Sequence, residues 1–260
     1  MLEQYSMLLF LAHIIGDFYL QDESMAKKKE KHLKWVFIHG LCYWLGVLIV
    51  TSVVMSRQVF VFGTGFAVLH ALIDIVKYFV PQRKDERNED TDTRTRNGFF
   101  IDQLAHFISV PIVAYRFTVS GGALELCNPV RQVLEGIGCS TEDLRTLLIW
   151  FVVLLLIHKP VNIAITRILA PFKPRCKSDH GDDRNAGRYI GTLERMIMIA
   201  LISLGQYSAI GLVLTAKSIA RYDMITKDPG FSEYYLLGTL LSTLSVIVIS
   251  VALLGLNPMF

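Results

Sequence analysis

Three segments of the chain each carry a histidine and an aspartate four residues apart. The pairs are His13 with Asp17, His70 with Asp74, and Asp102 with His106, and a fourth segment contributes His39. Residues four apart in an α-helix lie on one face, so each pair offers an imidazole and a carboxylate to the same point. Divalent transition metals bind such mixed groups. The seven residues therefore predict a metal site built from helices.

The 260-residue chain has the composition of an integral membrane protein. Hydrophobic residues make up 52% of it and charged residues 19%, whereas soluble domains are roughly 25% charged. The mean hydropathy is +0.43. Apolar stretches close to the roughly 20 residues that one span requires recur near residues 6–20, 35–55, 59–80, 98–118, 146–170, 190–215 and 235–256. We expect an all-α polytopic membrane protein with about seven transmembrane helices.

Basic residues cluster in three alternate loops, within residues 27–34, 83–96 and 173–188. Lysine and arginine concentrate on the cytoplasmic side of membrane proteins, so these loops are expected in the cytoplasm. The N-terminus is then outside and, with seven spans, the C-terminus is cytoplasmic.

This topology predicts a common depth for the three pairs. His13 and His70 precede their aspartates in inward-running helices, whereas His106 follows Asp102 in an outward-running one. Reversed order and reversed direction cancel, so each histidine is expected about one turn, roughly 5.4 Å, deeper than its aspartate. His39 is expected level with the aspartates. The cluster should form one layer near the cytoplasmic face, where ionisable groups are costly and are kept mainly for function.

The chain divides functionally near residue 120. Residues 1–120 hold the whole cluster, and we expect them to form a four-helix transmembrane bundle that builds the site from facing side chains. Residues 121–260 are expected to add a three-helix transmembrane extension. Lys217 and Arg221 share a face there, and Glu194 or Glu233 could neutralise them. These charges either form ion pairs that orient the helices or line a second polar pocket.

The candidate residues have different expected roles. All seven are candidate ligands for one or two ions of zinc, manganese or iron, although some should orient the ligating histidines instead. Asp17 and Asp102 are the candidate general bases. Lys77, one turn beyond Asp74, is a candidate for binding an anionic substrate, and extension toward the membrane interface is the alternative. Gly16 is expected to allow close packing or ligand approach.

The cysteines offer a further test of the topology. Cys127 and Cys139 fall in a loop expected on the outer side, where a disulfide is permitted. Two free thiols are the alternative. Cys42 and Cys176 are expected in a helix and in a cytoplasmic loop.

The segments that carry the cluster resemble a known family. They read His-x-x-Gly-Asp-Phe at 13–18, His-x-x-x-Asp at 70–74 and Asp-Gln-x-x-His at 102–106. Residues 5–118 resemble a bacterial family of uncharacterised polytopic membrane proteins, catalogued as a domain of unknown function. Stretches at 191–195, 216–221 and 233–239 are similar to the C-terminal extension of its longer members. The resemblance implies a multi-pass protein of the bacterial inner membrane and supplies no activity.

Three functions compete for the cluster. The leading hypothesis is a metal-dependent hydrolase that acts on a lipid or lipid-linked phosphate from the cytoplasmic side. A transporter that uses the cluster as an ion site or proton relay is the first alternative, and a metal-stabilised scaffold or sensor is the second. A buried polar network that only specifies helix packing would explain the pairs without a metal.

The expected partner is membrane lipid. Nucleic acid is not expected, because acidic and basic residues are mixed in the segment 85–96 as they are in a solvated loop. A protein partner is not indicated by the sequence, and a homo-oligomer stays open.

Overall fold

The apolar stretches form helices, which satisfy their own backbone hydrogen bonds in an apolar solvent. The computed structural model describes residues 1–80, 90–173 and 184–255, and this part of the chain contains no strand. The chain forms two compact units, Met1–Thr146 and Leu147–Phe260. The all-α class expected from the sequence is confirmed.

The first unit contains six complete helices in its described residues. They are α1 (Leu2–Ile14), α2 (Glu23–Lys29), α3 (Leu33–Thr51), α4 (Arg57–Phe79), α5 (Asp90–Val119) and α6 (Asn128–Gly136). A π-helical turn, Ile15–Tyr19, continues α1, and a 3-10 turn, Ser52–Val54, continues α3. Helix α7 (Thr141–Leu169) begins in this unit, continues into the second and ends in a 3-10 turn, Ala170–Phe172. The remaining helices are α8 (Arg184–Ser203), α9 (Tyr207–Ala220), α10 (Tyr222–Lys227) and α11 (Pro229–Leu254).

Among the described residues, five helices are long and apolar enough to cross a membrane. They cover Leu33–Val54, Arg57–Phe79, Arg96–Val119, Thr141–Phe172 and Pro229–Leu254. These helices correspond to five of the seven expected spans, so the polytopic class is confirmed. The first expected span, 6–20, forms α1 and the π-helical turn. The orientation of the chain in a membrane stays a prediction.

The sixth expected span, 190–215, is not one helix. Helix α8 ends at Ser203, and Gly205 then adopts a left-handed conformation with φ +68°. Backbone bonds from Gly205 to Ile202 and from Gln206 to Leu201 close the helix end in a Schellman arrangement. The sequence did not reveal this break, because glycine is also frequent in the interior of membrane helices.

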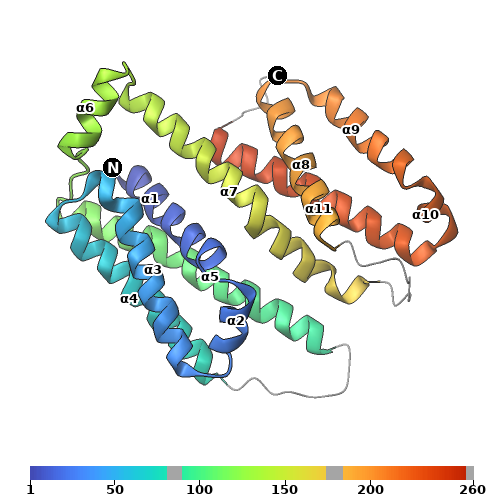
Figure 1. Cartoon of the computed structure of the whole chain (residues 1–260), viewed down its shortest axis with the longest axis horizontal. Coiled ribbons are helices and arrows are strands. Elements are labelled where there is room, and N and C mark those ends of the chain that lie inside the picture. The colour runs from blue at the N-terminus through green and yellow to red at the C-terminus, as the bar shows by residue number, and fades with distance from the viewer. Residues whose placement is uncertain (81–89, 174–183, 256–260) are drawn as a thin grey trace. The chain divides into compact units, whose positions relative to one another are not determined.

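Four helices of the first unit pack side by side, as Figure 1 shows. Helix α1 contacts α3 and α5, and α4 contacts the same two helices, so the four close into a ring. Buried apolar side chains fill its interior, and the rings of Tyr5 and Phe117 lie 4.1 Å apart between α1 and α5. The four-helix ring encloses the space that contains the His/Asp cluster.

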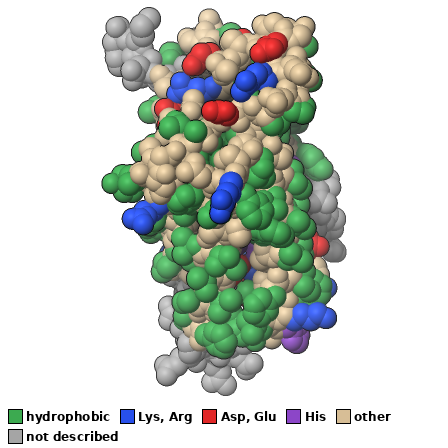
Figure 2. Space-filling view, turned by 90° about the vertical axis from the view of Figure 1, so that its left-hand side faces the viewer, with side chains coloured by type: hydrophobic (Ala, Val, Ile, Leu, Met, Phe, Trp, Pro, Cys, Tyr) green, Lys and Arg blue, Asp and Glu red, His purple; other side chains and the backbone are tan. Residues whose placement is uncertain are grey.

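The outer surface of these helices is apolar. Phe37, Ile49, Val76 and Ile101 are each more than half exposed. In Figure 2 hydrophobic side chains cover much of the face in view, acidic side chains gather mainly toward the upper end, and basic side chains lie both there and lower on the face. A surface of this kind suits a membrane rather than water.

The second unit has its own apolar core and a separate polar network. Core side chains come from α7, α8 and α11, including Ile157, Ile199 and Val246. The buried guanidinium of Arg195 donates to the Ile157 carbonyl at 2.9 Å, and also to Asn162 and Ser242, so it joins the same three helices.

The charged residues of the second half include an ion pair. Lys217 donates to Glu194 at 2.6 Å and thereby joins α9 to α8. Of the two roles expected for this polar set, the contacts favour ion pairs and hydrogen bonds that orient helices.

The disulfide expected between Cys127 and Cys139 is absent, and both are free thiols. The nine residues of helix α6 separate them. A helix of that length spans about 13 Å, beyond the roughly 7 Å that a disulfide can bridge between Cα atoms. Cys176 and the basic residues Arg83, Lys84, Arg87, Arg175 and Lys177 lie outside the described residues.

Candidate metal centre

The fold brings all seven predicted residues into the interior of the four-helix ring. His13 lies in the last turn of α1, His39 lies on α3, His70 and Asp74 lie on α4, and Asp102 and His106 lie on α5, with Asp17 in the π-helical turn. The four histidines are at most 1% exposed. Their burial follows from their spacing, because each polar pair occupies the inward face of an otherwise apolar helix.

The donor atoms gather into three groups. Within each group one atom from every residue lies within 4.8 Å of the others. The groups are His13, Asp17 and His70; then His39, His70 and Asp74; then Asp74, Asp102 and His106. Each of the seven predicted residues appears at least once, and His70 and Asp74 appear twice. The groups therefore form one connected cluster.

Asp17 is the acceptor at one end of this cluster. Its Oδ1 lies 3.1 Å from His39 Nε2 and 2.9 Å from His70 Nε2, and Gln103 donates to its Oδ2 at 3.2 Å. An ionised carboxylate only accepts, so both imidazoles place their proton on Nε2. Asp17 thus fixes the tautomer and the orientation of two histidines.

His106 is oriented by the backbone instead. Its Nδ1 lies 2.9 Å from the carbonyl oxygen of Asp102, one turn earlier in α5. Because a carbonyl oxygen only accepts, Nδ1 carries the proton and Nε2 is left with a lone pair. A metal-ligating histidine is usually held in this way through its second nitrogen.

The second nitrogens of these histidines are buried with no partner among the described residues. They are Nδ1 of His39, Nδ1 of His70 and Nε2 of His106, and Nε2 of His13 shares this state. A buried polar atom without a partner costs free energy, so a cluster of them indicates a ligand. Neutral imidazole lone pairs fit a divalent metal ion.

Tyr43 positions two of the histidines. Its ring stacks on His70 with 3.6 Å between centroids, and its hydroxyl lies 3.3 Å from His13 Nδ1. A Cβ at Gly16 would lie 2.7 Å from Tyr43 Cε2, closer than packed carbon atoms approach. The close packing expected at Gly16 is confirmed, and it serves the aromatic ring.

Two lysines neutralise carboxylates of the cluster. Lys29 of α2 donates to Asp74 Oδ2 at 2.6 Å and to Gln21 at 2.9 Å. Lys77 donates to Asp102 Oδ2 at 2.8 Å, and its side chain is 43% exposed. The Lys77 ammonium thus lies at the edge of the site, in contact with an aspartate rather than extended away from it.

The histidine rings also lie near one another. His70 and His106 have centroids 4.1 Å apart, and His13 lies 5.4 Å from His106 and 5.9 Å from His70. His39 Nε2 instead contacts Asp17 and lies 3.7 Å from Asp74 Oδ2. The histidines and aspartates therefore lie in contact with one another, and the depth of their layer in a membrane stays a prediction.

Sequence reasoning missed Tyr43, Lys29, Gln103 and Gln21. Three of them lie at helical spacing from a cluster residue: Tyr43 is four residues after His39, Gln21 four after Asp17, and Gln103 three before His106. That periodicity was an available signal. No such signal distinguished Lys29, because it is one of several lysines in its segment.

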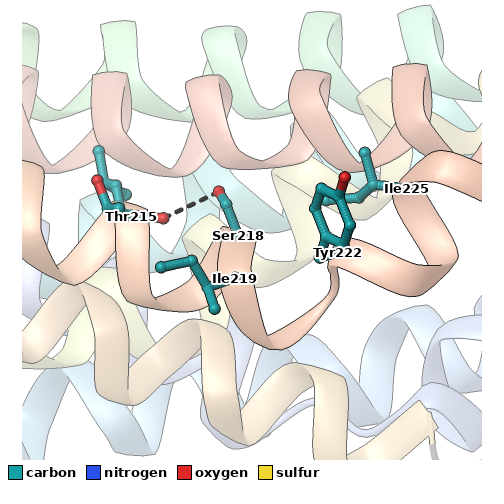
Figure 3. A pocket seen from close by; sticks show the side chains of 6 residues that line it. Thr215, Ser218, Ile219, Tyr222 and Ile225 are labelled. Atoms are coloured by element: carbon teal, nitrogen blue, oxygen red, sulfur yellow. Dashed lines mark hydrogen bonds between the residues drawn. The ribbon is translucent and has the colours of Figure 1, made fainter.

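The pocket in Figure 3 lies elsewhere, in the second unit. It has a volume of about 400 Å³ and is lined by Leu214, Thr215, Ser218, Ile219, Tyr222 and Ile225. Its hydroxyls on Thr215 and Ser218 donate to carbonyls of their own helix. The lining contains no histidine or carboxylate, so the His/Asp cluster is the better candidate for chemistry.

The fold and the cluster define a polytopic, all-helical membrane protein with groups of histidine and aspartate that could hold a metal ion. Residues 6–134 match a family described as "Protein of unknown function (DUF3307)". The matched part of the chain contains all seven residues of the cluster. No curated protein and no solved structure matches the chain.

Proposed function

We propose that the protein is a metal-dependent membrane hydrolase that acts on a lipid or lipid-linked phosphate from the cytoplasmic side. One observation carries the proposal: three imidazole nitrogens of the cluster are buried beside carboxyl groups and have no hydrogen-bond partner among the described residues. A packing network would be expected to pair these nitrogens internally, since unpaired polar atoms destabilise a core. A divalent ion held there supplies Lewis-acid chemistry, polarising a phosphoryl or ester oxygen and activating water.

The contacts distinguish the two candidate general bases. Both oxygens of Asp17 already accept N–H groups, which supports an orienting role. Asp102 Oδ1 is buried and has no hydrogen-bond partner in the described part of the chain, while Oδ2 accepts from Lys77. Asp102 therefore has an oxygen free for a metal ion or a proton, and Asp17 has none.

The surroundings of the cluster favour a lipid substrate. The four helices carry exposed apolar side chains that suit contact with acyl chains. Lys77 lies beside the cluster and is partly exposed, so its ammonium can bind a phosphate once a metal ion has taken over Asp102.

The test combines metal content with turnover. Full-length protein purified in detergent is loaded with Mn²⁺ or Zn²⁺ and assayed for phosphate release from phosphatidic acid and a polyprenyl phosphate. We expect stoichiometric metal and release of phosphate, both lost in His70→Ala and kept in His32→Ala, which alters an exposed histidine. Metal binding without any hydrolysis would favour the transporter, checked by metal uptake into reconstituted vesicles. Absence of metal would favour the packing network.

A further inference from the structure

Among the described residues, Asp74 is the one aspartate that belongs to two of the three donor groups. It lies with His39 and His70 in one group and with Asp102 and His106 in another. The residue is 4% exposed, so solvent does not separate the two groups. A buried carboxylate shared by two sets of ligands has two oxygens to offer and can bind one cation on each.

The third group does not offer a comparable site. It depends on Asp17, whose Oδ1 accepts from His39 and His70 and whose Oδ2 accepts from Gln103. A metal ion on Asp17 would have to displace these N–H groups. The hydrogen bonds therefore leave two groups for metal and place Asp17 behind them as the orienting carboxylate.

Each of the two remaining groups already binds one cation. The ammonium of Lys29 lies 2.6 Å from Asp74 Oδ2, and the ammonium of Lys77 lies 2.8 Å from Asp102 Oδ2. The carboxylates of Asp74 and Asp102 thus stabilise positive charge at two separate positions. Divalent ions compete for the same oxygens with twice the charge.

Both groups also hold imidazole nitrogens suited to ligation. His39 and His70 serve the first group and His106 serves the second, and each keeps one buried nitrogen without a partner. His70 faces Asp74 Oδ2 with its free nitrogen, Nδ1, at 3.8 Å, whereas His39 faces the same oxygen with Nε2, at 3.7 Å, and would give up its hydrogen bond to Asp17 on binding a metal ion there. The two groups therefore have complementary ligand sets, with two imidazoles on one side and an imidazole with a second carboxylate on the other.

We propose that the cluster is a dinuclear centre in which the carboxylate of Asp74 bridges two divalent ions. His39 and His70 bind the first ion, and Asp102 and His106 bind the second. The dinuclear centre rests on one part of the proposed function, namely that the cluster binds metal. Two ions that share a bridge would clamp a phosphoryl oxygen from both sides, which favours a phosphate ester as the substrate class.

The experiment measures stoichiometry and magnetic coupling in the full-length protein with Mn²⁺ as the probe. Detergent-purified chain is titrated with Mn²⁺, freed of excess metal by gel filtration, and examined by elemental analysis and low-temperature electron paramagnetic resonance. We expect two ions per chain and an exchange-coupled spectrum in place of the six-line signal of isolated Mn²⁺. Both measurements use the wild-type protein, so they do not require any variant to fold.

Matched variants assign the two positions. His39→Ala and His106→Ala should each leave one ion and restore the six-line signal, whereas His32→Ala should keep two coupled ions. Asp74→Asn, which preserves shape, should abolish coupling and reduce the content to at most one ion. One ion per wild-type chain, or two without coupling, overturns the dinuclear centre and leaves the metal site standing. No bound metal overturns both.

Discussion

The ring of Tyr43 stacks on the imidazole of His70, with 3.6 Å between centroids and 23° between planes. The stack lies inside the four-helix ring, where both residues are almost fully buried. It depends on the missing side chain of Gly16, against which the Tyr43 ring packs. The backbone of the first helical segment thus sets the position of an imidazole of the cluster on α4 through one aromatic ring.

Gly16→Ala should disturb the cluster without touching a ligand. The added methyl would clash with Tyr43 and shift His70, destabilising the protein by about 1–3 kcal/mol, as overpacking usually does. We also expect Mn²⁺ affinity to fall by roughly tenfold, equivalent to ~1.4 kcal/mol. Thermal unfolding and equilibrium dialysis measure the two effects.

Gly65→Ala is the matched control, because a Cβ there meets nothing within 4 Å. It should leave metal affinity unchanged and stabilise α4 by up to about 1 kcal/mol. Equal metal affinity in the two variants would show that Tyr43 does not position His70.

Asp17→Asn should weaken metal binding while the fold is kept. The amide has one acceptor oxygen in place of the two carboxylate oxygens that now accept from His39, His70 and Gln103. Loss of an orienting carboxylate typically costs about 10–100-fold in metal affinity. Isothermal titration with Zn²⁺ measures the loss.

Asp22→Asn provides the same chemical change a few residues later. Asp22 caps α2 by accepting from the Met25 amide, and asparagine caps a helix equally well. Its metal affinity should match the wild type. A similar loss in both variants would assign the effect to general electrostatics instead of to the contacts of Asp17.

The sequence could predict the membership of the cluster because helical spacing is local. Residues four apart share a face whatever the rest of the chain does, so His70 and Asp74 could be paired without a structure. The inward direction also followed, because a polar pair on an apolar helix is stable only on the protected side.

The contacts that give the residues separate roles could not be predicted. Lys29 reaches Asp74 across 45 positions of the chain, and nothing in its own segment distinguishes it from Lys27 or Lys28. The π-helical turn that carries Asp17 packs against Tyr43 at Gly16, and helix propensity does not encode such a turn. The Lys29–Asp74 contact and the packing of the π-helical turn both form between segments that are distant in the sequence.

Metal should stabilise the folded protein. A ligand that binds only the native state at 100 times its dissociation constant adds about 2.7 kcal/mol. We therefore expect Mn²⁺ to raise the unfolding temperature and a chelator to reverse the rise, as followed by differential scanning fluorimetry in detergent. The increase should disappear in His70→Ala and persist in His32→Ala. A rise that survives in His70→Ala would locate the stabilising ion outside the cluster.

Lys29→Gln should strengthen metal binding. The ammonium lies 2.6 Å from the Asp74 oxygen that also faces His39 and His70, so it competes with a metal ion for that oxygen. Removing the charge should raise Mn²⁺ affinity on the order of tenfold, equivalent to ~1.4 kcal/mol. Lys27→Gln, on the exposed side of the same helix, should leave affinity unchanged because its charge is screened by solvent. Titrations at low and high salt separate the two: the gain in Lys29→Gln should persist at high salt, since the pair is buried. Weaker binding in Lys29→Gln would mean that Lys29 supports the site by holding Asp74 in place.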